Sequence, residues 1–173
     1  HILPEFFYLP LYDDLHRTIS VPSDEKESLV QKGFREYLLC QECETQLSKY
    51  EGYAARLIQN IDNFQKDSSG LFVYSNNMDY RKFKLFQLSI LWRAGVSRHK
   101  MFSQVKLGSK HEERIRCMLV EENPGRFFDY GCFITMFPNA QKIDKIIWSP
   151  VEIRLDGHNG YKLMTGNLMW YFF

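Results

Sequence analysis

A Cys40-x-x-Cys43 pair stands at the start of the clearest amphipathic pattern in the chain, and this combination constrains the fold more than any other feature. From residue 42 to residue 64, apolar side chains recur at steps of three and four: Leu47, Tyr50, Ala54, Leu57, Ile58, Ile61 and Phe64. This spacing predicts a helix with one apolar face. Both cysteines then lie at its N-terminal end, where the positive helix end lowers the pKa of a thiol and favours a metal-bound thiolate.

Two more helices are predicted from capping and turn residues. Asp79 is expected to cap a second helix that runs to about Ala94 and ends at Gly95. Ser109 is expected to cap a third helix over residues 110–122.

The second half of the chain is rich in strand patterns. Strands are expected at 16–21, 71–74, 127–137, 145–155, 161–165 and 168–173. Residues 156–160, with the sequence Asp-Gly-His-Asn-Gly, predict a tight hairpin turn. The charged segment 23–32 is expected to be a solvated loop. Together these patterns predict an α+β protein with helices followed by a C-terminal antiparallel sheet.

Composition narrows the class of protein further. The 173 residues are 45% hydrophobic and 25% charged, which is typical of a folded globular chain. We expect a finger over residues 1–66 and a larger body over 67–173, or one continuous domain. No apolar run reaches the roughly 18 residues of a membrane helix, and no signal peptide is visible. Four cysteines are too few for a disulfide framework, so a reduced, cytoplasmic setting is expected.

Basic residues gather in one part of a chain whose net charge is only +1. Eight Lys or Arg residues stand between positions 78 and 110, against one acidic residue. Among them, Arg93, Arg98 and Lys100 lie close in sequence to aromatic residues, an arrangement that can follow a phosphate backbone and stack on bases. The alternative is an exposed loop whose charge serves solubility.

Two short motifs carry a family resemblance. His1-Ile2-Leu3-Pro4 lies upstream, and Leu39-Cys40-Gln41-Glu42-Cys43-Glu44 leads into the predicted helix. Over residues 1–60 this arrangement resembles the HNH-type (ββα-metal) endonucleases, including bacterial and phage-type proteins. The resemblance implies an N-terminal ββα zinc finger in which Cys40 and Cys43 hold structural Zn²⁺. It also implies that His1 activates water, and that Glu44 or Glu51 holds a catalytic Mg²⁺ or Mn²⁺.

The motifs also depart from that family. The Asn or His that follows the second cysteine is Glu44 here, and the later metal-binding His has no counterpart, Glu51 being the nearest candidate. No CxxC precedes His1. Because the chain opens on His1 rather than on methionine, we expect a piece of a longer protein with further ligands upstream.

Two functions therefore compete. The first is a metal-dependent DNA endonuclease of HNH type, or a degenerate relative, acting in bacterial defence against phage. The second is a non-catalytic, zinc-stapled subunit that docks a nucleic acid or a protein partner. A small-molecule enzyme is a weaker third reading, since the sequence has no glycine-rich phosphate loop and no nucleophile elbow. The run His111-Glu112-Glu113 lacks the second histidine of a zincin motif and is expected to be a solvated helix start.

Overall fold

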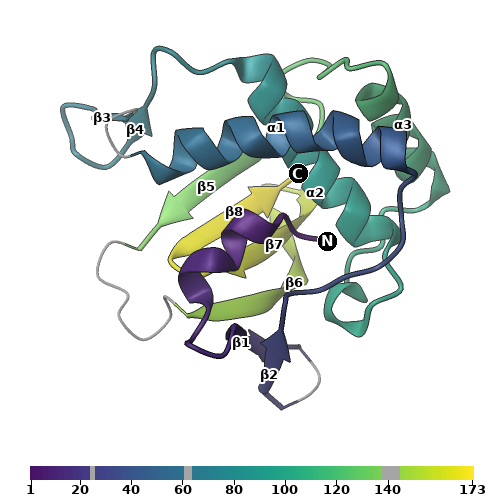
Figure 1. Cartoon of the computed structure of the whole chain (residues 1–173). Helices are drawn as coiled ribbons and strands as arrows, with labels where there is room; N and C mark the ends of the chain where they lie inside the picture. Colours follow the sequence, from purple (N-terminus) through teal and green to yellow (C-terminus); the bar gives the residue numbers. More distant parts are fainter. Residues whose placement is uncertain (24–25, 61–63, 138–144) are drawn as a thin grey trace.

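The computed structural model in Figure 1 describes residues 1–23, 26–60, 64–137 and 145–173. Its elements follow one another as η1 (Glu5–Phe7), η2 (Leu9–Leu11), β1 (Arg17–Val21), β2 (Ser28–Gln31), α1 (Gln41–Gln59), β3 (Gln65–Lys66), β4 (Val73–Tyr74), α2 (Tyr80–Val96), η4 (Lys100–Phe102), α3 (Ser109–Val120), β5 (Cys132–Met136), β6 (Ile146–Leu155), β7 (His158–Thr165) and β8 (Leu168–Phe172). The expected α+β class is confirmed. No helix in the described ranges has the length and apolar character needed to cross a membrane.

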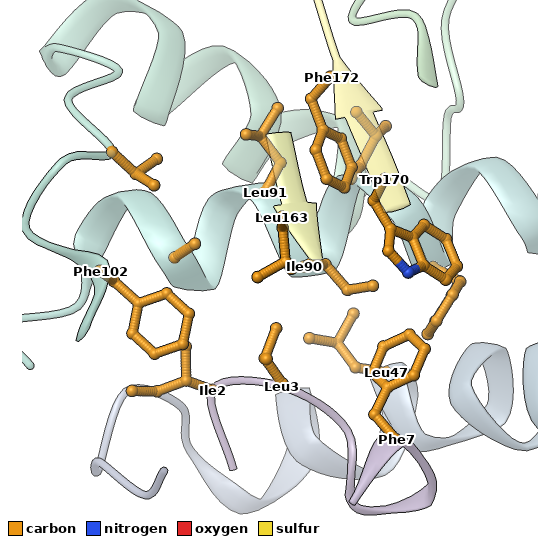
Figure 2. Close-up of a cluster of buried hydrophobic side chains, with 14 of the residues drawn as sticks. Ile2, Leu3, Phe7, Leu47, Ile90, Leu91, Phe102, Leu163, Trp170 and Phe172 are labelled. Atoms are coloured by element: carbon orange, nitrogen blue, oxygen red, sulfur yellow. The ribbon is translucent and has the colours of Figure 1, made fainter. Parts of the chain in front are cut away.

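The main sheet draws strands from both ends of the chain. Its order is β2-β1-β6-β7-β8-β5, with β1 parallel to β6 and every other neighbouring pair antiparallel. Figure 1 shows η1 against this sheet, and the ring of Phe7 in η1 meets the ring of Trp170 in β8 edge-on at 5.2 Å. Figure 2 shows Ile2 and Leu3 in the same buried cluster as Trp170 and Phe172. Residues 1–66 and 67–173 thus share one sheet and one core.

Turn chemistry sets the register of the C-terminal strands. Asp156 and Gly157 form a two-residue turn between β6 and β7, with φ of 48° and 83° and with Leu155 paired to His158. Positive φ at both positions matches the twist of a hairpin, and Asp-Gly tolerates it well. The predicted hairpin is confirmed, but its turn is shorter than the expected 156–160, and β7 begins at His158 rather than at residue 161.

Helix α1 buries the stripe that the sequence predicts. Leu47, Tyr50, Ala54 and Leu57 are buried, and the cysteine pair lies at the helix start as expected. The helix ends at Gln59 rather than near residue 64, and the expected continuation through 61–63 falls outside the described residues.

Helix α2 is buried on nearly all sides. Its predicted cap is confirmed, because the Asp79 carboxylate accepts a hydrogen bond from the Lys82 backbone N–H at 3.0 Å. The predicted stop at Gly95 is wrong, since the helix continues to Val96. A Cβ at position 95 would lie 2.4 Å from Cδ1 of Leu107, so the glycine permits the close approach of that side chain.

Three further expectations differ from the structure. Helix α3 is preceded by Gly108, with φ of 76°, as its N-cap residue, so Ser109 is the first helical residue and not the cap. Strand β2 lies inside the segment expected to be a loop, where it pairs with β1 at the edge of the sheet. Most of β2 is exposed, as is common for edge strands. Because it lacks a buried apolar face and lies in a charged segment, the sequence shows no alternating strand pattern there. The strand expected at 71–74 is shortened to β4.

A buried ion pair joins three parts of the core. Arg93 of α2, with 3% of its side chain exposed, contacts the Glu51 carboxylate of α1 at 2.7 Å. The same guanidinium donates to the backbone carbonyl of His1 at 3.0 Å and to the carbonyl of Ser89 at 3.2 Å. One buried cation therefore fixes α1, α2 and the N-terminal segment relative to one another.

We predict that Glu51→Ala lowers the free energy of unfolding by about 3 kcal/mol, because it leaves the Arg93 charge buried without its partner. Urea denaturation followed by circular dichroism measures this change. Glu113→Ala is the matched control, since it breaks the exposed Glu113–Arg116 pair and should cost less than about 1 kcal/mol. Equal losses in the two variants would contradict the assigned role of Glu51.

Candidate functional site

The two predicted cysteines come together at the start of α1. Cys40 is the N-cap residue and is exposed, whereas Cys43 lies in the first turn and is half-buried. A hydrogen bond from the Cys43 backbone N–H, followed in size by one from the Cys43 thiol, lowers the pKa of Cys40 below its usual value. The same thiol–thiol contact raises the pKa of Cys43. Of the two thiols, Cys40 is therefore the one that loses its proton more readily.

An apolar cavity of about 170 Å³ lies beside the two sulfurs. It is lined by Leu38, Leu39, Cys40, Cys43, Gln46, Leu47, Trp92, Arg116, Leu119 and Val120. Arg116 is the cationic residue of this lining, and its guanidinium is held by Glu113 at 2.7 Å. The positive charge of Arg116 lowers the pKa of Cys43, whereas the hydrogen bond to Cys40 raises it.

The cysteine pair fits half of a structural zinc site. Zinc in such sites takes four ligands in a tetrahedron, usually cysteine or histidine, and thiolates two residues apart at a helix start can occupy two positions. In the ranges that the structure describes, no three His, Cys, Asp or Glu side chains come together in a way that could hold a metal. Among the described residues, Cys40 and Cys43 could supply two of the four ligands of such a site.

The carboxylates expected at a catalytic Mg²⁺ or Mn²⁺ do not meet. Glu44 is exposed in the first turn of α1, where its backbone N–H donates to the carbonyl of Cys40. Glu51 lies two turns further along and is paired with Arg93. Magnesium and manganese need several oxygen ligands around one point, and these two side chains do not offer them.

His1 lies in an irregular segment and not at the end of a strand. The Arg35 guanidinium Nε lies 2.9 Å from Nε2 of His1 and 3.1 Å from the carbonyl oxygen of Lys32. Nε2 of His1 also lies 3.2 Å from the Lys32 carbonyl oxygen, so its role as donor or acceptor depends on the tautomer of the ring. A water-activating role requires a ring nitrogen with a free lone pair, which Nδ1 has when Nε2 donates to Lys32 and lacks when Nε2 accepts from Arg35.

Of the three residues predicted to contact phosphate, one is buried in the interior and two lie on the surface. Arg93 is buried in its ion pair and presents almost no surface to a phosphate, contrary to the expectation. Arg98 and Lys100 are exposed on the segment after α2. A basic sequence context does not reveal this difference, because the partner of Arg93 lies 42 positions upstream in α1.

Two further basic residues lie beside this segment. Glu36 accepts hydrogen bonds from the Ser97 hydroxyl at 2.7 Å and from the Arg98 backbone N–H at 3.0 Å, which fastens segment 32–36 to segment 97–100. The ring of Phe34 meets that of His99 at 4.9 Å. We define the basic cluster as Lys32, Arg35, Arg98 and Lys100. Lys32 and Arg35 are exposed, and no local motif in the sequence marks them.

Neither the family models, nor the curated proteins, nor the solved structures contain a match to this chain.

We predict that Cys40→Ser and Cys43→Ser each weaken zinc binding by at least about 100-fold, because even the loss of a residue that only hydrogen-bonds a zinc ligand costs about 10- to 100-fold. Competition with a chromophoric chelator measures the affinity. Cys117→Ser is the control and should bind zinc as the unaltered chain does. An unchanged affinity in both test variants would exclude the pair as ligands.

Proposed function

We propose that this chain is a zinc-stapled nucleic-acid-binding protein, a non-cutting relative of the HNH-type endonucleases. The observation that carries the proposal is the basic cluster. Its four cations come from two segments that are 60 or more positions apart in sequence and are fastened together by Glu36. Lys and Arg side chains gathered in this way are the usual means of contacting a phosphate backbone.

The local charge favours an anionic partner. Segment 32–36 carries Lys32, Arg35 and Glu36, and segment 97–100 adds Arg98 and Lys100 with no acid. The carboxylate of Glu36 is occupied by Ser97 and Arg98 and braces the surface from within. Because the backbone of both segments is held in this way, less ordering accompanies phosphate binding.

Nucleic-acid binding without hydrolysis is consistent with the positions of His1, Glu51 and the cysteine pair. Hydrolysis of a phosphodiester by a metal-dependent nuclease needs a base that accepts a proton from water and an ion that stabilises the developing charge. Nε2 of His1 contacts both Arg35 and the Lys32 carbonyl oxygen, and Glu51 is paired with Arg93. The zinc held by Cys40 and Cys43 then has a structural role, namely to hold the start of α1.

An active HNH-type endonuclease in bacterial defence against phage is the second candidate. The order β1, β2, α1, with a cysteine pair at the start of α1, supports it, because this is the ββα order that the resemblance implies. Incubation of the whole chain with supercoiled plasmid and Mg²⁺ or Mn²⁺ separates the two candidates. The binding proposal predicts intact plasmid. Cleavage that His1→Ala abolishes would establish the nuclease instead.

We predict that Arg35→Ala combined with Arg98→Ala weakens nucleic-acid binding and reduces the slope of log affinity against log salt concentration by about two, one unit for each lost phosphate contact. Fluorescence polarisation with a labelled oligonucleotide, repeated over a range of salt concentrations, measures both quantities.

Lys110→Ala is the control for that experiment, since Lys110 is an exposed cation in the first turn of α3, outside the basic cluster. It should leave the slope unchanged. If the control and the double variant shift the slope equally, binding is a property of total charge and the basic cluster is not the interface.

A further inference from the structure

Strand β5 forms one edge of the main sheet, and β2 forms the other (Figure 1). Edge strands of soluble proteins usually carry a charge, a proline or a bulge, which discourages pairing with another chain. Strand β2 fits this rule, because its four residues stand between Glu27 and Lys32. Strand β5 does not, because its sequence Cys-Phe-Ile-Thr-Met has no charge and no proline, and its register against β8 is unbroken.

The backbone of β5 offers hydrogen-bonding groups at this edge. The N–H of Phe173 donates to the carbonyl of Gly131 at 2.9 Å, and the N–H of Phe137 donates to the residue 167 carbonyl at 2.9 Å. In an antiparallel pair, residues that bond to the neighbouring strand alternate with residues whose backbone groups point away from it. Among the described strands, only β8 pairs with β5. The outward N–H and C=O groups therefore belong to Cys132, Ile134 and Met136.

The side chains of β5 are complementary to those of a second β5 strand. When two copies pair antiparallel about Ile134, Phe133 of each copy lies opposite Thr135 of the other. Phe137 of each copy then lies opposite Gly131 of the other. Phe133 and Phe137 are 44% and 40% exposed, and a Cβ at position 131 would have no atom within 4 Å, so the ring of Phe137 has free space over the glycine. An aromatic side chain across from an edge glycine is a known means of fixing the register of paired strands.

We propose that this chain forms a two-fold symmetric dimer in which the two β5 strands pair antiparallel and join the main sheets of both copies. The outward groups of Ile134 then bond to those of Ile134 in the second copy, and the groups of Cys132 bond to those of Met136. Because β5 carries no charge, no like charges meet across the two-fold axis. A second copy is the favoured occupant, because the match of large and small side chains holds for this strand against itself. The dimer goes beyond the proposed binding of nucleic acid and does not depend on it.

Sedimentation velocity of the whole chain, without nucleic acid and over a range of concentrations, tests for this dimer. The unaltered chain should sediment as a dimer that dissociates on dilution. Met136→Pro removes one outward N–H from each copy and no hydrogen bond to β8, so it should weaken dimerisation by at least about 10-fold. Met136→Ala is the matched control, since it also loses the methionine side chain but keeps the N–H, and it should still dimerise.

Amide hydrogen exchange of the unaltered chain gives a second measurement, in case Met136→Pro fails to fold. The amides of Cys132, Ile134 and Met136 should exchange slowly at concentrations that favour the dimer and rapidly after dilution. A chain that stays monomeric at every concentration would overturn the proposal, and so would a dimer in which these three amides exchange rapidly. Nucleic-acid binding is measured separately by polarisation, so failure of the dimer and failure of the proposed function are distinguishable.

Discussion

The interior charge of Arg93 is the constraint on which the arrangement of this protein depends. A guanidinium removed from water is stable only when its charge is balanced and its donors are used. Glu51, Ser89 and the carbonyl of His1 meet these demands. The N-terminal segment thereby lies against α2, and Ile2 in turn donates its N–H to the carbonyl of Phe34. Segment 32–36, which carries half of the basic cluster, is thus linked to Arg93 through the N-terminal residues, in addition to the bonds from Glu36 to Ser97 and Arg98.

The sequence predicted those structural elements that depend on residues close to one another in the chain. The Asp79 cap, the Asp156–Gly157 turn and the apolar stripe of α1 each depend on residues a few positions apart. Gly95 shows where this reasoning stops. Its usual meaning is a helix end, yet here it admits the side chain of Leu107 into contact with α2. Such contacts between distant segments leave no mark on the local pattern.

In the candidate site, too, the features with local causes were predicted and those that depend on distant residues were not. The cysteine pair at the helix start was predicted, because CxxC spacing and helical periodicity are both visible locally. The partner of His1 was not, since Arg35 lies 34 positions away and is brought to the imidazole by tertiary packing. The burial of Arg93 was missed for a related reason, since it stands in a basic stretch and its counter-charge belongs to α1. A resemblance to a family indicates which residue types stand at the expected site. The hydrogen bonds and ion pairs of the folded chain determine whether those side chains can bind a ligand or accept a proton.

The proposed function depends on zinc binding by the sulfurs of Cys40 and Cys43. X-ray absorption at the zinc edge of the purified protein tests it most directly, because the spectrum identifies the atoms bound to the metal. The account predicts sulfur neighbours at about 2.3 Å from zinc. A first shell of nitrogen and oxygen alone, at about 2.0 Å, would contradict it.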